Sequence, residues 1–172
     1  MRTTRLCFAA TLMLLAMGGG LQPATAAEGA VCSATFVIIL DPGFSADPST
    51  GTHRSERPGV LNCDGSVNGS PITGAGTLTD EGPYGTDDPD TCADGTEGTG
   101  IDRLTVPTRD GVQEIESRYS YTAGKKSNGG PFRGEFKGTR FTGSFTFRVL
   151  EGNCVTKSVT KVELDLKGII HD

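Results

Sequence analysis

The chain has 172 residues, 35% of them hydrophobic, with 25 glycines, no tryptophan and a formal net charge of −5. This acidic balance argues against nucleic acid or an anionic membrane surface as the partner. Beyond the N-terminal segment, no apolar run approaches the roughly 20 residues that a membrane helix needs, so membrane insertion is not expected.

Residues 1–27 show the order of features that marks a secretory signal peptide. Arg2 and Arg5 are followed by an apolar stretch over residues 6–17, and the segment ends in small residues suited to cleavage. Its removal leaves 172 − 27 = 145 residues and, with two arginines and no acid lost, a charge of −5 − 2 = −7. We therefore predict a secreted, extracellular protein with a single domain over residues 28–172.

The cysteines predict a disulfide framework. Cys7 lies in the predicted signal peptide, which leaves Cys32, Cys63, Cys92 and Cys154. An even number of cysteines in an exported chain predicts two disulfide bonds, although spacing alone allows three connectivities. We favour Cys32 with Cys63 and Cys92 with Cys154. Zinc is not favoured, because neither CxxC nor HxxxH spacing occurs.

The first half of the predicted domain alternates strands with long polar connections. Residues 33–40 are β-branched and almost continuously apolar, which is typical of a central strand buried on both faces. Residues 41–58 are rich in Pro, Gly, Ser, Thr and charge, and they are predicted to form an exposed loop. After a weakly alternating strand at 72–79, residues 80–102 contain eight acidic residues and no basic one. We expect a long acidic loop there, held by Cys92.

Residues 113–122 restore the alternating pattern of a strand. Tyr119 and Tyr121 share one face, whereas Glu114 and Glu116 lie on the other together with an arginine. A solvated outer face explains the two glutamates more simply than a catalytic carboxylate pair does.

The clearest pattern is a hairpin near the C-terminus. In residues 132–137 Phe, Gly and Phe alternate with charged residues, and in 141–149 the apolar residues return at every second position. The Gly-Thr pair between the two segments predicts a tight turn. A turn centred there places Lys137 opposite Arg140, where like charges repel unless the loop is longer. The predicted core pairs are Phe136 with Phe141, Gly134 with Gly143, and Phe132 with Phe145.

The last strand pattern covers residues 162–167, where Val, Leu and Leu alternate with Glu, Asp and Lys. Apolar residues just before it have the opposite parity, which predicts a β-bulge or a break near Thr160. No stretch has a sustained helical period. About seven or eight strands with glycine-rich turns predict an all-β, disulfide-stapled fold. We favour a small antiparallel β-barrel, with a two-sheet β-sandwich as the alternative.

The sequence contains no recognisable catalytic motif, and we assign no catalytic residue. His53 and His171 lie in segments predicted to be exposed, whereas a site based on histidine needs that residue held rigidly by its neighbours.

The acidic segment offers hard oxygen ligands of the kind that calcium prefers. Their spacing is not that of an EF-hand loop, and a solvated acidic loop explains the composition better. No cofactor is expected, and calcium is kept as an alternative. The candidate ligands are Asp88, Asp90, Asp94 and Glu97.

The leading hypothesis is a secreted, non-enzymatic binding module whose loops contact an extracellular protein or a small ligand. The alternative is a small-barrel enzyme of cyclase or isomerase type, or a carrier of an apolar ligand. Its interior pocket would involve Tyr119, Tyr121, Phe132 and Phe136. A secreted protease inhibitor is a further alternative.

The many inward aromatic side chains predict a mostly filled interior, and a cavity of about 300 Å3 or more with convergent polar groups would favour the enzyme or carrier. The sequence does not specify an oligomeric state.

Overall fold

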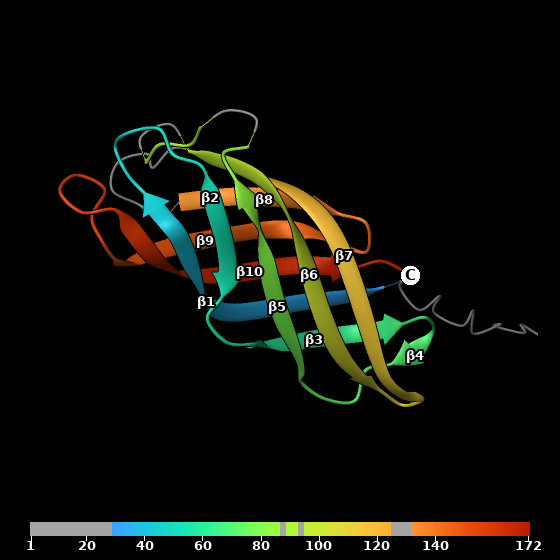
Figure 1. Ribbon diagram of the computed structural model, residues 1–172. Helices are drawn as coiled ribbons and strands as arrows, with labels where there is room; N and C mark the ends of the chain where they lie inside the picture. Colours follow the sequence, from blue (N-terminus) through green and yellow to red (C-terminus); the bar gives the residue numbers. More distant parts are fainter. Residues whose placement is uncertain (1–28, 87–88, 93–94, 125–131) are drawn as a thin grey trace, which may run out of the picture.

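The computed structural model describes residues 29–86, 89–92, 95–124 and 132–172. Within them the chain forms ten β-strands (Figure 1). This part of the chain contains no helix able to span a lipid bilayer. The predicted signal peptide lies outside the described residues and stays a prediction. The strands are β1 (Ala30–Phe44), β2 (Gly51–Ser55), β3 (Gly59–Val67), β4 (Ser70–Pro71), β5 (Gly76–Tyr84), β6 (Thr96–Thr108), β7 (Gly111–Ala123), β8 (Phe132–Gly138), β9 (Phe141–Glu151) and β10 (Val159–Ile170).

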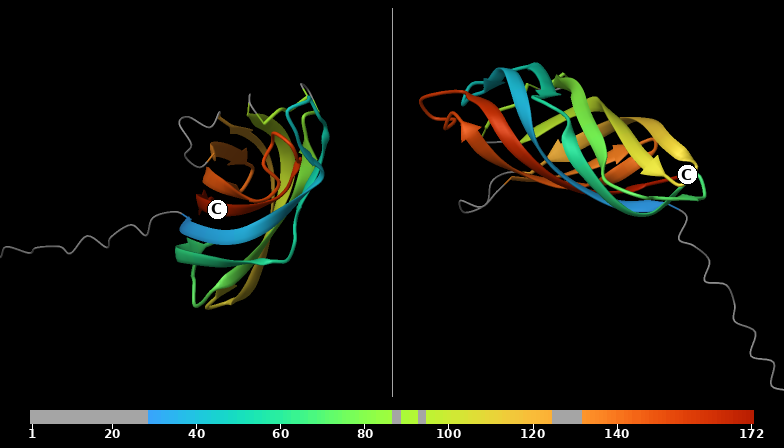
Figure 2. Two further views of the ribbon diagram at one scale, coloured as in Figure 1. Left: turned by 90° about the vertical axis from the view of Figure 1, so that its left-hand side faces the viewer. Right: turned by 90° about the horizontal axis from the view of Figure 1, so that it is seen from below.

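The strands form one sheet that closes on itself. Neighbours follow the order β10-β9-β8-β7-β6-β5-β2-β1-β3-β4, and β1 also pairs with β10. β2 and β3 lie one after the other between β1 and β5, so they share one position in the wall. The result is a closed antiparallel barrel of eight strand positions (Figure 2), which confirms the predicted barrel over the sandwich.

Each wall strand turns every second side chain toward the barrel interior. In β1 the burial alternates from Ala30 to Leu40, and the residues between the buried ones remain exposed or partly exposed. The prediction that residues 33–40 are buried on both faces is therefore wrong. An apolar run in a barrel wall needs burial on its inner face only, and Val37 and Ile39 face outward.

The two segments predicted to be long loops contribute strands to the wall, which corrects the sequence interpretation. The predicted loop 41–58 contains the end of β1 and all of β2, and the predicted loop 80–102 contains the end of β5 and the start of β6. Residues 85–95 alone connect β5 to β6. Pairing with a strand on each side supplies the stability that residues of low intrinsic strand propensity lack.

The β8–β9 hairpin confirms which of its side chains face the core. It does not confirm their pairing, because β9 is shifted by two residues relative to the prediction. Phe136 lies opposite Gly143, and the two strands meet through a turn at Thr139 and Arg140. The buried phenylalanines of the hairpin are Phe136, Phe141, Phe145 and Phe147.

The observed register has a physical reason at each end of the hairpin. Lys137 pairs with Thr142 rather than facing Arg140, which removes the contact between like charges. Phe132 pairs with Phe147, and their rings stack with centroids 4.6 Å apart. Both effects favour this register over the predicted one.

The register shift predicted near Thr160 is confirmed. β10 begins at Val159, and its pairing with β9 is irregular between Lys161 and Val162. The irregularity changes the face that the strand turns inward, so that Val159 and Val162, which have opposite parity, are both buried in the barrel.

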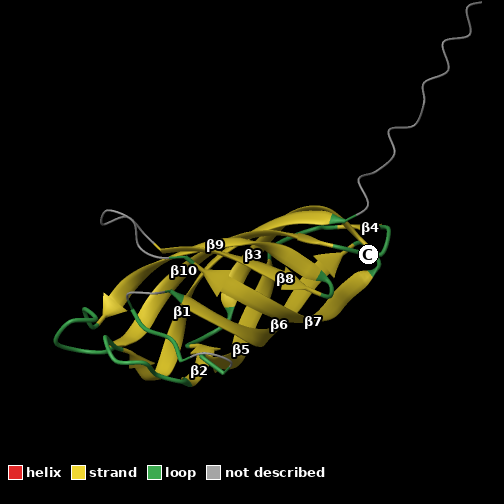
Figure 3. Ribbon diagram, turned by 90° about the horizontal axis from the view of Figure 1, so that it is seen from above, coloured by secondary structure: helices red, strands yellow, loops and turns green. Residues whose placement is uncertain are grey.

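Both predicted disulfide bonds are present. Cys32 and Cys63 are direct partners on β1 and β3, with Cα atoms 4.1 Å apart. Cys92 and Cys154 have Cα atoms 6.0 Å apart and join the β5–β6 connection to the β9–β10 connection. Figure 3 shows the connections gathered at the ends of the barrel. Disulfides are consistent with an extracellular protein.

The interior divides into a filled half and a half with free space. The filled half surrounds the start of β1 and the end of β10, and the free space lies near the end of β1 and the start of β6. The largest fully buried side chains of the filled half are Leu61, Val67, Leu78, Leu104, Val106, Phe141 and Ile170.

Candidate functional site

A cavity of about 70 Å3 lies inside the barrel, near the end of β1 and the start of β6. This volume is well below the lower limit of about 300 Å3 for common ligand pockets, in agreement with the predicted mostly filled interior. The apolar part of its wall includes Ile38, Leu40, Phe136, Phe145, Val162 and Leu164.

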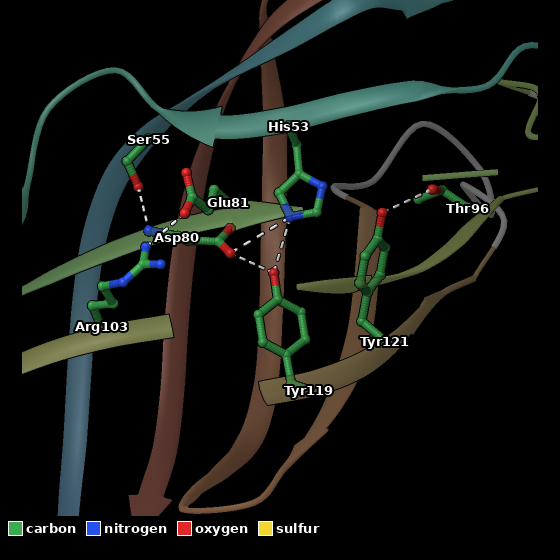
Figure 4. A network of polar contacts seen from close by, with 8 residues as sticks. All are labelled: His53, Ser55, Asp80, Glu81, Thr96, Arg103, Tyr119 and Tyr121. Atoms are coloured by element: carbon green, nitrogen blue, oxygen red, sulfur yellow. Dashed lines mark hydrogen bonds and ion pairs between the residues drawn. The ribbon is translucent and has the colours of Figure 1, made fainter. Parts of the chain in front are cut away.

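Three polar side chains from three strands meet at this cavity (Figure 4). His53 on β2 has its Nε2 atom 3.0 Å from the Tyr119 hydroxyl on β7 and 3.5 Å from Asp80 Oδ1 on β5. The Tyr119 hydroxyl also donates a short hydrogen bond to Asp80 Oδ1. The three groups therefore form one connected cluster.

The position of His53 corrects the sequence interpretation, which expects an exposed loop histidine. β2 pairs with β1 and β5, where His53 lies opposite Leu40 and Gly82, and this pairing turns the imidazole into the barrel. His53 is only 6% exposed. His171 is exposed as expected, and its Nε2 atom lies 2.7 Å from Thr142 Oγ1.

The second ring nitrogen of His53 has no hydrogen-bond partner in the part of the chain that the structure describes. Nδ1 is buried without a hydrogen bond among the described residues. The imidazole meets the Tyr121 ring edge-on, with centroids 5.7 Å apart, and in Figure 4 Nδ1 lies on the side of the imidazole toward Tyr121. A buried polar atom without a hydrogen bond is uncommon in folded proteins, which makes Nδ1 a candidate acceptor for a hydrogen bond from a ligand.

Asp102 on β6 places a second carboxyl group beside Asp80. The two residues are direct partners across β5 and β6, and Asp102 is 2% exposed. Burial, and then the charge of Asp80, raise the pKa of Asp102 well above its ordinary value of 3.8. The raised pKa favours the protonated carboxyl group, which can donate a hydrogen bond into the cavity.

Two tyrosine hydroxyls complete the polar part of the wall. Burial raises the pKa of Tyr119, and the charge of Asp80 raises it further. Burial also raises the pKa of Tyr121, against the opposing effect of its contact with Thr96 Oγ1 at 3.4 Å. Both hydroxyls therefore keep their protons and can donate them in hydrogen bonds.

Glycines on β6 make room for these two rings. Gly100 pairs with Tyr119 and Gly98 pairs with Tyr121. A Cβ atom at Gly100 would overlap the hydroxyl end of Tyr119, and one at Gly98 would press on the Tyr121 ring. The aromatic rings thus lie across bare backbone, which brings their hydroxyls toward β5 and β2.

The residues predicted for an interior pocket are largely brought together. Tyr119, Tyr121 and Phe136 line the cavity. Phe132 is not part of the cavity wall, and its ring stacks on Phe147, which is.

Glu114 and Glu116 lie on the outer face of β7, as predicted. Glu116 lies 3.8 Å from Arg103, and these residues belong to an exposed row of charges. Neither glutamate contributes to the cavity wall.

The calcium hypothesis stays a prediction. Asp88 and Asp94 lie outside the described residues. Asp90 is buried and accepts hydrogen bonds from Thr96 Oγ1 at 2.5 Å and from the Glu97 backbone N–H at 3.2 Å, so it fixes the start of β6. Over the described ranges, no group of three or more His, Cys, Asp and Glu side chains is arranged to hold a metal ion.

Sequence reasoning missed the polar cluster, although a signal for two of its members was present. Asp80 has the parity of Leu78, and Asp102 has the parity of Leu104. If the acidic segment is taken as two strands, both carboxyl groups point inward.

No protein-family model, no curated protein and no solved structure matches this chain. The chemistry of the cavity is therefore the basis for a functional proposal.

Proposed function

We propose that the barrel binds one small, largely apolar molecule with a hydroxyl or carbonyl group inside its cavity. The unpartnered Nδ1 of His53 carries this proposal. Leaving such a polar atom buried and unsatisfied costs about 1–3 kcal/mol, and a hydrogen bond from a ligand would remove this cost.

The cavity wall supports this ligand chemistry. Phe136 and Phe145 offer apolar contact, and the neutral carboxyl of Asp102 and the hydroxyl of Tyr121 offer donors. A volume of about 70 Å3, well below that of common ligand pockets, favours a small ligand. Binding through exposed loops and protease inhibition rest on composition alone and remain hypotheses.

Secretion is part of the same proposal. The charged, apolar and small-residue order of residues 1–27 supports an export signal, and the two disulfide bonds support an oxidising compartment. Expression of the full chain in an exporting host, with N-terminal sequencing of the product from the medium, tests it. We expect a mature chain that begins near Glu28.

The ligand site can be tested with phenol, which has an apolar ring and one hydroxyl donor. Phenol is titrated into protein that carries isotope-labelled histidine, and the imidazole nitrogen resonances are followed by NMR. We expect a saturable shift of the His53 Nδ1 resonance and none at His171, because only His53 lines the cavity.

A pair of variants on β10 separates cavity binding from surface binding. Leu164→Phe adds volume to the cavity wall and is expected to weaken phenol binding, whereas Ile169→Phe adds the same kind of ring on the outer face and is expected to leave it unchanged. Equal weakening by both variants, or no shift of His53 up to the solubility of phenol, would overturn the proposal.

A further inference from the structure

We propose that His53 is a general base that removes a proton from the carbon next to the carbonyl group of a small ketone or aldehyde bound in the cavity, so that the barrel catalyses enolisation. This inference rests on the proposed ligand site and adds a reaction to it. It needs only groups that line the cavity.

The hydrogen-bond pattern fixes which nitrogen of His53 is the base. The Tyr119 hydroxyl has one proton, and it donates that proton to Asp80. The contact of 3.0 Å between His53 Nε2 and the Tyr119 oxygen is a hydrogen bond only if Nε2 carries a proton and donates it. In the neutral imidazole, Nδ1 is then the nitrogen with the free lone pair. This is the same nitrogen that lacks a partner.

Two polar groups hold the Nε2 side of the imidazole. Asp80 Oδ1 lies 3.5 Å from Nε2, and Tyr119 bridges the same two groups. A buried carboxylate on one side of an imidazole holds its orientation and stabilises its charged form, which is the role of the acidic residue in serine hydrolase triads. Asp80 and Tyr119 are thus positioning residues for His53.

The opposite requirement, stabilisation of negative charge on the carbonyl oxygen, is met by donors in the same wall. Asp102 and Tyr121 both line the cavity, and the burial that raises the pKa of each group keeps its proton available for donation. Donors that are fixed in a dry site before the reaction stabilise a developing oxyanion strongly.

The step balances without a further reactant. The electron pair of the C–H bond forms the carbon–carbon double bond of the enolate, the carbonyl π pair moves to oxygen, and the proton goes to Nδ1. Return of a proton from Nδ1 to the same carbon regenerates the ketone, and return to a more distant carbon of an unsaturated ketone shifts its double bond. In heavy water the returning proton is replaced by a deuteron.

Cyclopentanone, which has six non-hydrogen atoms, is a probe of suitable size. The mature protein, residues 28–172, is incubated with cyclopentanone in heavy water. The loss of the α-hydrogen signal is followed by NMR. We expect exchange at least about 100-fold faster than with the same concentration of free imidazole, which is the lower end of the effect of a positioned general base. Saturating phenol is expected to suppress the enhancement by occupying the cavity.

Variants distinguish the loss of the general base from a loss of the folded structure. His53→Gln is expected to lose the enhancement, and His171→Gln, which removes the exposed histidine, is expected to keep it. His53→Ala is expected to regain exchange when imidazole is added, beyond the rate of imidazole in buffer. Tyr119→Phe is expected to slow the exchange and to change the proton distribution between Nδ1 and Nε2, visible in the imidazole nitrogen shifts, which a purely structural role would not produce.

The outcomes separate this inference from the ligand site itself. If phenol binds at His53 and exchange is no faster than with free imidazole, the general-base inference is wrong while the binding proposal stands. If phenol does not bind, the binding proposal fails first. Exchange that survives in His53→Gln would assign the base to another residue and would equally overturn the inference.

Discussion

Asp80 and Asp102 face each other directly across β5 and β6 inside the barrel, although both side chains are carboxyl groups. Two negative charges in such a place repel each other, and burial penalises each of them. The pair therefore favours the protonated form of Asp102, whose pKa is raised well above 3.8. This arrangement makes the stability of the barrel depend on pH.

Asp102→Asn is expected to stabilise the protein at neutral pH. Below pH 3.8 the carboxyl is protonated in both the folded and the unfolded state. As the pH rises from there to the raised pKa, the folded state holds the extra proton, so the wild type loses stability with a slope of up to about 1.4 kcal/mol per pH unit. An amide at this position cannot ionise.

Urea unfolding of wild type and variant across this pH range measures the difference. The advantage of Asp102→Asn should grow with pH and then level off above the raised pKa. A difference that does not change with pH would show that Asp102 ionises as readily in the barrel as in the unfolded chain.

Gly100→Ala is expected to destabilise the barrel by about 1–3 kcal/mol, because the added methyl group overlaps the hydroxyl end of Tyr119. It should also move this hydroxyl away from Asp80 and His53. Gly74→Ala is the matched control, since the space around Gly74 is open, and a change within about 0.5 kcal/mol is expected there. Thermal unfolding and the imidazole nitrogen shifts report the two effects, and an unperturbed His53 in Gly100→Ala would contradict the packing argument.

The fold could be predicted from the sequence wherever one face of a strand is clearly apolar. The alternation in residues 132–137 and 162–167 identifies the inward faces of β8 and β10 correctly. The pairing of β8 with β9 could not be predicted in the same way, because a shift by two residues keeps every side chain on its face. The choice between registers depends on contacts across the strands, such as the stacking of Phe132 on Phe147.

The site was harder to predict, because its polar residues interrupt the apolar pattern that identifies strands. β2 has only five residues, and His53 lies between Thr52 and Arg54 without an apolar neighbour to show which face is inward. Asp80 and Asp102 have inward parity, but the many acids around them indicate a solvated loop. These polar and acidic segments become wall strands because the sheet must pair along both of its edges to close into a barrel.

The mature protein is expected to contain no free thiol, which thiol titration of the unfolded, unreduced chain measures. The two bonds link residues separated by 31 and 62 positions, so chain entropy predicts a loss of about 4 kcal/mol for opening either one. Replacing Cys32 and Cys63 together by serine, or Cys92 and Cys154 together by serine, tests each bond by urea unfolding. Two or more reactive thiols in the unreduced protein would contradict the disulfide framework.

Phe136→Ala is expected to destabilise the barrel by about 3–5 kcal/mol, because its ring is buried and its loss adds empty space to the interior. Glu135→Ala, the next residue on the same strand, points outward and should change stability by less than about 0.5 kcal/mol. Urea unfolding of both variants gives the comparison, and reversed magnitudes would mean that the barrel wall faces the other way.

Because Phe136 also lines the cavity, the folded Phe136→Ala variant should accept a larger phenol, such as one with a short alkyl group, than the wild type does. Stability loss without this change in ligand size would indicate that the wall collapses into the vacated space instead of widening the site.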